Sequence, residues 1–244
     1  LRRPPSSTPK TSSASSDVYK IQLVDEEKRL VSEFVIEITL LGQNVNSYGR
    51  DLTTQLRSAV PDSKDNFRAG LRWAQDDKRR PRTLFPDLLR DIGSIDGLRR
   101  LRFTSPHPKD FRREVIEAMA ETSAVCEHLH LPLQSGSDHI LAAMHRGYNK
   151  SKYMERLSEA RKHIPDLAVT TDIIVGFPGE TEKDFEETLA LAAEAEFDGA
   201  YTFIFSPRPG TEAAEMVESY CDPSVAGERY DRLRSVILRS ALRK

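Results

Sequence analysis

The chain has 244 residues, with 36 Lys and Arg against 38 Asp and Glu, and a formal net charge of −2. Hydrophobic residues make up 38%, charged residues 30%, and the mean hydropathy is −0.52. This composition is typical of a soluble globular protein that can bury a substantial core, and no apolar run approaches the length that crosses a bilayer. Because the charges balance, contact with nucleic acid requires local basic patches.

The first sixteen residues, LRRPPSSTPKTSSASS, are rich in Pro and Ser and contain no acidic residue. Such a segment cannot bury enough apolar surface to fold, so 1–16 is predicted to be a disordered tail and 17–244 a folded core. Its acid-poor composition is also similar to that of organelle transit peptides, although a plain tail is the favoured reading.

The core begins with helical spacing of apolar residues over 18–34, followed by the strand-like run VIEITLLG at 35–42. The stretch at about 50–84 is polar and irregular, which predicts a loop insertion over the strand ends. It holds the basic run Lys78–Arg82, whose charges could contact RNA phosphates. Solvated loop charge is the more frequent explanation of such a run.

Helices and strands then alternate to the end of the chain. Helices are expected at 85–95, 110–121, 137–144, 151–163, 181–195 and about 225–242, and strands at 100–105, 128–133, 168–175 and 200–205. Five strands, most of them separated by helices, predict an α/β fold with parallel strands joined by right-handed crossovers. Five are too few for a closed eight-stranded barrel, so we expect an incomplete parallel (β/α) barrel.

Four of the strands end in turns of small and polar residues: LGQN at 41–44, QSGS at 134–137, VGFPGE at 175–180 and SPRPGT at 206–211. Amides, hydroxyls and helix amino termini can bind a carboxylate or phosphate, and glycines let the backbone approach a flat group. Arg208 stands between two prolines, which pre-organises its guanidinium for an anion. One such turn is usually only a loop, but four on one edge indicate a ligand site.

Histidines and cysteines give weaker signals. His128 and His130 alternate on a strand and could ligate a metal from one face, although hydrogen-bonded core histidines are the favoured reading. His107 follows another strand and is the better candidate for ligand contact. Cys126 and Cys221 lie far apart with no CxxC spacing, so we expect small buried residues rather than a metal site.

Five segments resemble those of the MiaB-like tRNA methylthiotransferases of the radical-SAM type, in the same order. They are LLGQNVNSYG, RFTSPHPKDF, HLHLPLQSGSD, DIIVGFPGETEKDF and FIFSPRPGT. The resemblance implies a radical-SAM partial barrel, S-adenosylmethionine as cofactor, and a [4Fe–4S] cluster supplied with electrons by a donor. It implies addition of a methylthio group to N6-isopentenyladenosine beside the anticodon of tRNA, without a membrane partner.

The resemblance also implies which residues line the cofactor and substrate cleft: Gln43, Asn44, Gln134, Ser135, Arg146, Asp172 and Arg208. Arg146 and Arg208 are the candidates for a carboxylate or phosphate, and the glycines of VGFPGE for packing on adenine. No side chain is assigned a catalytic or metal-ligating role.

The sequence departs from the family pattern because it lacks the CxxxCxxC motif that binds the cluster. We therefore expect a fragment without the cluster-binding amino-terminal part, which by itself is inactive. The alternative is a cluster-free α/β protein that retains ligand or partner binding. SAVP at 58–61 with RFTSPHPKDF resembles the eukaryotic branch, which favours a mitochondrial over a cytoplasmic location; the oligomeric state is left open.

Overall fold

A computed structural model describes residues 14–50 and 84–243, with side chains from residue 22 onward. The insertion predicted at about 50–84, including Lys78–Arg82, lies almost wholly outside the described residues, as does most of the predicted tail. The first helix begins at Ala14, so the last three residues of that tail belong to the helix.

The described chain alternates helices and strands as predicted. The strands are β1 (Glu37–Leu40), β2 (Arg100–Phe103), β3 (His128–His130), β4 (Ala168–Val175) and β5 (Gly199–Ile204). The helices are α1 (Ala14–Ser32), α3 (Phe85–Gly93), α4 (Arg113–Glu121), α5 (Asp138–Ala143), α6 (Lys150–His163), α7 (Glu182–Ala195), α8 (Glu212–Glu215) and α9 (Pro223–Ala241). Short 3₁₀ turns are η1 (Val45–Ser47), η3 (Pro108–Asp110) and η4 (Val217–Ser219).

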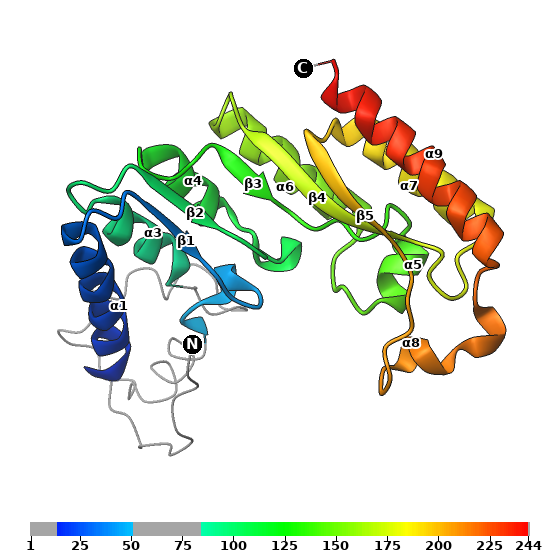
Figure 1. Cartoon of the computed structure of the whole chain (residues 1–244), viewed down its shortest axis with the longest axis horizontal. Coiled ribbons are helices and arrows are strands. Elements are labelled where there is room, and N and C mark those ends of the chain that lie inside the picture. Colours follow the sequence, from blue (N-terminus) through cyan, green and yellow to red (C-terminus); the bar gives the residue numbers. More distant parts are fainter. Residues whose placement is uncertain (1–13, 51–83, 244) are drawn as a thin grey trace, which may run out of the picture.

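All strand pairs are parallel, and the strands lie side by side in chain order. β1 pairs with β2, and β3, β4 and β5 form a second sheet in that order. A parallel bridge between Leu101 and Val125 connects the two. Figure 1 shows the resulting arch, with α1 at the β1 end and α9 at the β5 end. This confirms the predicted incomplete parallel (β/α) barrel.

Several predicted boundaries differ from those in the structure, two of them by three residues. The strand expected at 128–133 is regular only to His130, because the Leu133 N–H donates to the side-chain hydroxyl of Thr171 at 2.9 Å instead of to a backbone carbonyl of β4. Pairing with β4 resumes at Gln134, whose N–H donates to the Asp172 carbonyl at 2.7 Å. The helix expected from residue 110 begins at Arg113, because Pro108 starts a separate 3₁₀ turn.

The sheet has two unlike faces. Along β4, Val169, Thr171, Ile173 and Val175 are fully buried, because they face the helices across one continuous apolar core. The residues between them are only half-buried. We call this second side the inner face; on it lie His128, His130, Thr170, Asp172, Tyr201 and Phe203.

Among the described helices, none is both long and apolar enough to span a membrane.

Candidate functional site

The turns after β1 and β2 are tied together at the carboxyl-terminal edge of the sheet. Asn44 has a left-handed backbone (φ 59°), and its side-chain amide donates to Asp110 Oδ2 at 2.9 Å. Asn46 is fully buried and binds the His107 backbone twice, accepting from its N–H at 2.9 Å and donating to its carbonyl at 3.1 Å. We call Asn44, Asn46, His107, Asp110 and Arg146 the rim cluster.

Asp110 anchors this cluster as a buried anion. Only 3% of its side chain is exposed, and Arg50 contacts its second oxygen at 2.5 Å. Burial disfavours the charge, but the hydrogen bonds from Asn44 and Arg50 outweigh it and lower the pKa of Asp110. The carboxylate is therefore ionised at neutral pH. Both of its oxygens are bound by protein side chains, so Asp110 has a structural role in the rim cluster.

The segment after α5 joins the cluster from another element. The ring of His107 packs edge-on against that of Tyr148, with centroids 5.5 Å apart. Burial and then the positive charges of Arg146, Lys109 and Arg50 lower the pKa of His107, against the opposing effect of Asp110. His107 is therefore neutral at physiological pH, and its Nδ1 accepts from the Lys109 N–H at 3.2 Å.

Two polar atoms of the rim cluster are buried yet unsatisfied. Asn44 Oδ1, an acceptor, and Arg146 Nε, a donor, have no hydrogen-bond partner among the residues that the structure describes. Buried polar groups are normally paired, so such atoms require an explanation. An ammonium group satisfies an amide oxygen and a carboxylate satisfies a guanidinium, so these two atoms match in chemical kind the two ends of an α-amino acid group.

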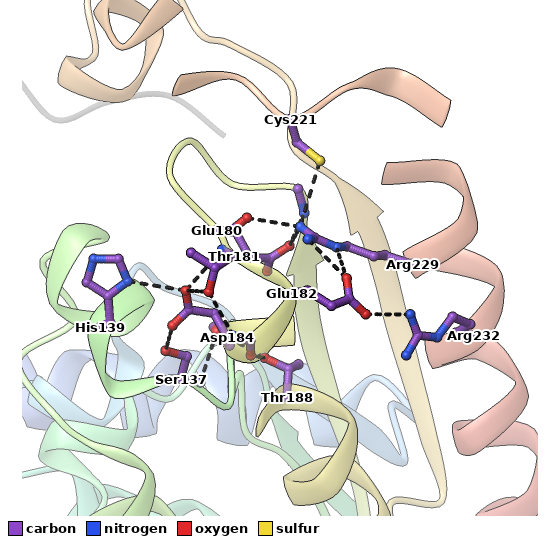
Figure 2. Close-up of polar contacts among 12 residues, drawn as sticks. Ser137, His139, Glu180, Thr181, Glu182, Asp184, Thr188, Cys221, Arg229 and Arg232 are labelled. Atoms are coloured by element: carbon purple, nitrogen blue, oxygen red, sulfur yellow. Dashed lines mark hydrogen bonds and ion pairs between the residues drawn. The ribbon is translucent and has the colours of Figure 1, made fainter. Parts of the chain in front are cut away.

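A second set of polar residues lies where α7 begins. Figure 2 shows that their side chains form hydrogen bonds with one another. Asp184 accepts from the Ser137 hydroxyl at 2.5 Å, and from the Thr181 hydroxyl and N–H at 2.6 and 3.0 Å. Although burial opposes ionisation, these hydrogen bonds lower the pKa of Asp184 to about 2. We call Ser135, Ser137, Thr181, Asp184 and Thr188 the α7 network.

The α7 network includes Ser135, one of the residues expected to line the cleft. This residue is fully buried, and its hydroxyl bonds Thr188 Oγ1 at 3.2 Å and accepts from the Ser137 N–H at 3.2 Å. Gly136 beside it lies so close to α7 that a Cβ would meet Thr188 Cα at 2.6 Å. The QSGS turn therefore packs closely on α7, and the Ser135 hydroxyl is engaged in hydrogen bonds within the α7 network.

A buried ion pair lies next to this network and was not predicted. Arg229 Nη1 donates to Glu180 Oε2 at 2.8 Å, with 6% and 0% of the two side chains exposed. The same oxygen accepts from the Gly176 N–H at 2.8 Å, and this hydrogen bond fixes the turn after β4. Burial raises the pKa of Glu180. An arginine in the buried stripe of α9, with Ala226, Leu233 and Ile237, is the sequence signal that could have revealed it.

The inner face carries a chain of hydrogen bonds. His130 contacts Thr170 Oγ1 through Nδ1 at 3.0 Å and Asp172 Oδ2 through Nε2 at 3.3 Å, and His128 reaches the same threonine at 3.3 Å. The structure thus places the predicted cleft residue Asp172 beside His130, and Thr170 links His130 to His128. The described residues include no group of three His, Cys, Asp or Glu that could hold a metal.

The remaining predicted residues share the same edge of the sheet, because all the strands are parallel. Gln43, His107, Gln134, Gly179 and Arg208 therefore all follow strands at one edge of the sheet, which we call the mouth. Gln43 and Arg208 are exposed, whereas Gln134 is 8% exposed and has a left-handed backbone (φ 69°). The Arg208 loop approaches the rim cluster through Glu212, which contacts His145 at 3.0 Å.

An open cavity of about 440 Å³ lies away from this mouth. It is lined by residues that precede β2 and β3 or follow α4 and α6, among them Arg99, Cys126, His163 and Pro165. These positions are at the amino-terminal ends of the strands, opposite the predicted turns. Cys126 and Cys221 are both half-buried free thiols, not the buried residues that we expected.

Comparison with known proteins agrees with this geometry. The sequence profile of the Radical SAM superfamily matches residues 15–192. The chain is 50% identical over 211 residues to the tRNA-2-methylthio-N(6)-dimethylallyladenosine synthase of Rhodococcus jostii (strain RHA1), covering 86% of the chain and 37% of that protein. It is 49% identical over 220 residues to the enzyme of the same name from Acidothermus cellulolyticus (strain ATCC 43068 / DSM 8971 / 11B), covering 90% and 39%.

A solved structure shares the fold. The coproporphyrinogen III oxidase of Escherichia coli, described as a radical SAM enzyme, superposes with a TM-score of 0.53 at 15% identity. The match covers 95% of this chain and 45% of the oxidase.

Proposed function

Because the chain belongs to the Radical SAM superfamily, we propose that it forms the cofactor- and substrate-binding part of a tRNA-2-methylthio-N6-dimethylallyladenosine synthase. Support comes from the 50% identity to proteins of that name, of which the chain spans 37% to 39%. The observation in the structure that carries the proposal is the pair of unsatisfied atoms, Asn44 Oδ1 and Arg146 Nε.

S-adenosylmethionine matches this pair because it ends in an amino group and a carboxylate. We propose that Asn44 binds the amino group and Arg146 the carboxylate, with Gln43 and Arg208 at the same mouth. Gly179 (φ +83°) has nothing within 4 Å of the position of a Cβ, which leaves room for the flat adenine. Gln134 and Asp172 lie between these ends and complete the proposed cleft; Ser135 is left out because its hydroxyl is buried.

The residues of this chain do not fit a [4Fe–4S] cluster. When bound to a [4Fe–4S] cluster, S-adenosylmethionine supplies the 5′-deoxyadenosyl radical that activates adenine C2 for addition of the methylthio group. A cluster with one open iron needs three thiolates, and this sequence has two cysteines without cluster spacing. We therefore assign binding of the cofactor and of tRNA to these residues, but no step through the cluster and no site for the electron donor.

Titration calorimetry with S-adenosylmethionine tests the proposal. Arg146→Gln, and Asn44→Gly, which keeps the left-handed backbone, are each expected to weaken binding about tenfold, because each removes one charge-assisted hydrogen bond. Arg232→Gln is the matched control, since Arg232 is a half-exposed arginine of α9 paired with Glu182 and Glu186. Absence of binding, or equal loss in the control, contradicts the proposal.

The alternative of a cluster-free binding protein is favoured by the cysteine count, and anaerobic reconstitution with iron, sulfide and reductant examines it. We expect no stoichiometric cluster and no 5′-deoxyadenosine from this chain alone. Iron content, visible absorbance and chromatography of the nucleoside are the measurements. A brown protein with near-stoichiometric cluster iron and turnover would instead require unusual ligands, with Cys126, His128 and His130 first to be tested.

We propose further that the chain comes from the eukaryotic branch of the family and acts in mitochondria. The resemblance of residues 58–61 and 102–111 to that branch supports this, as does the acid-poor composition of residues 1–16. Subcellular fractionation with an antibody against the chain is the test, and recovery in the cytosol alone contradicts it.

A further inference from the structure

One segment of the chain contacts the mouth at two separate places. It covers residues 206–221, between β5 and α9, and contains the SPRPGT turn, α8 and η4. Figure 1 shows it in orange, leaving the end of β5 and returning to the start of α9. None of its residues is buried, so its position depends on its contacts with the mouth rather than on the apolar core. We call this segment the strap.

The carboxyl-terminal end of the strap is bound to the turn after β4 by several contacts. The Gly179 N–H donates to the Ser219 carbonyl at 2.9 Å. The ring of Phe177 packs edge-on against that of Phe205 with centroids 5.3 Å apart, and Phe205 meets Tyr220 in the same way at 5.8 Å. Because a backbone hydrogen bond and a row of three rings act together here, we expect this end to stay in place.

The other end of the strap is held by one exposed contact, which we call the latch. It joins His145 Nε2 to Glu212 Oε2 at 3.0 Å, and the imidazole N–H donates because a carboxylate only accepts. The two side chains are 75% and 77% exposed, and exposed pairs of this kind contribute little free energy. Gly210, two residues before Glu212, has a left-handed backbone (φ 81°) and nothing within 4 Å of the position of a Cβ. This end is therefore free to detach.

The latch determines where Arg208 lies. His145 directly precedes Arg146 of the rim cluster, and Glu212 follows Arg208 by four residues. Between them, the hydroxyl and the N–H of Thr211 both donate to the Arg208 carbonyl, at 2.8 and 3.2 Å, so this part of the loop is held as a unit. A closed latch therefore keeps the Arg208 loop beside the Arg146 segment, whereas an open latch releases it.

We propose that the strap closes the mouth over bound S-adenosylmethionine. Its end at Ser219 stays fixed, while the latch between His145 and Glu212 opens to admit the cofactor and closes to retain it. His145 and Glu212 are positioning residues, since they act through the Arg208 loop rather than on the ligand. This inference rests on the proposed function, and it adds the means by which the cofactor enters the mouth and is held there.

Hydrogen exchange of the full chain, followed by mass spectrometry with and without S-adenosylmethionine, tests whether the strap closes. Exchange at residues 210–216 should slow by at least about threefold when the cofactor binds, because closure suppresses local opening of the backbone. Exchange in α4 should not change. Calorimetry on the same samples establishes that the cofactor is bound.

Variants of the latch test its role. His145→Glu places a carboxylate against Glu212, so S-adenosylmethionine should dissociate about fivefold faster in surface plasmon resonance, and protection of the strap should disappear. His145→Gln is the matched control, because it keeps a neutral donor at the same left-handed position (φ 55°) and should stay within about twofold of the wild type. His145→Glu combined with Glu212→Lys restores an ion pair, and should restore slow dissociation and protection.

The outcomes separate the strap from the proposed function. If the cofactor binds but exchange at residues 210–216 is unchanged, the strap is wrong and the proposed function stands. Equal dissociation rates for His145→Glu and His145→Gln, or no rescue in a double variant that melts like the wild type, would also overturn the strap. A wild-type chain that binds no S-adenosylmethionine would overturn both proposals.

Discussion

The rim cluster and the α7 network lie on the same edge of the sheet and use similar residue types. They differ in how completely their buried polar atoms are paired by hydrogen bonds. In the α7 network the carboxylate of Asp184 is matched by hydroxyl and backbone donors at 2.5 to 3.0 Å. In the rim cluster Asn44 and Arg146 each keep one buried atom without a partner among the described residues. Satisfied polar groups stabilise the fold, whereas the two unsatisfied atoms of the rim cluster are the ones that we propose bind a ligand.

The largest effect is expected on the α7 side, at the ion pair beside the network. Arg229→Met leaves the Glu180 carboxylate buried without its counter-charge, so the free energy of unfolding should fall by about 3–5 kcal/mol. Chemical denaturation measures it. Removing both charges with Glu180→Gln and Arg229→Met together should recover most of the loss, because a neutral side chain tolerates burial.

Arg232→Gln serves as the exposed counterpart of that change. Its side chain is 35% exposed, so the loss should stay below about 1 kcal/mol. If Arg229→Met lowers the free energy of unfolding by no more than Arg232→Gln does, the buried ion pair does not stabilise this edge of the sheet. The proposed difference between the α7 side and the rim cluster would then be wrong.

An intermediate effect should appear as pH dependence. The pKa of Asp184 is lowered to about 2, so its ionised form stabilises the fold above the pKa of the unfolded chain, and that contribution is lost as pH falls toward 2. The loss should amount to about 2 kcal/mol. Denaturation at pH values from about 5 down to 2 should therefore show a shallower decline for Asp184→Asn than for the wild type. Parallel curves would show that Asp184 is not the group responsible.

The smallest effect on stability is expected in the rim cluster. Arg146→Gln removes a side chain whose Nε has no partner among the described residues, so the free energy of unfolding should change by less than about 0.5 kcal/mol. A loss above about 2 kcal/mol by denaturation would mean that Arg146 supports the fold, and the rim would then resemble the α7 network.

The fold was predictable because its signals are local. Buried and half-buried residues alternate along β4, and its predicted bounds match those in the structure. The end of β3 and the start of α4 differ from the expected bounds because Leu133 donates to a side chain and Pro108 starts a 3₁₀ turn, and hydrophobic periodicity registers neither. The short helix α8 was missed because none of its residues is buried, so it leaves no apolar pattern.

The site was less predictable, because its geometry depends on contacts between distant segments. The position of Asn44, His107 and Arg208 at one edge of the sheet could be predicted, because it follows from the parallel direction of the strands alone. That Ser135 is buried follows from the approach of Thr188 on α7, 53 residues later, and the burial of Glu180 follows from Arg229, 49 residues later. Tyr201 and Phe203 belong to a run that reads equally well as a strand buried on both faces.

The arrangement of strands in chain order has a consequence for how the protein folds. Partners in the first strand pair, Glu37 and Arg100, are 63 residues apart, whereas His130 and Thr170 are 40 apart, and Val169 and Asp198 are 29 apart. Because the entropy lost on closing a loop grows with its length, the pairing of β4 with β5 is the least costly of these three strand ladders to form. β4 and β5 should therefore pair early, and the ladder of β1 with β2 should form later than that of β4 with β5.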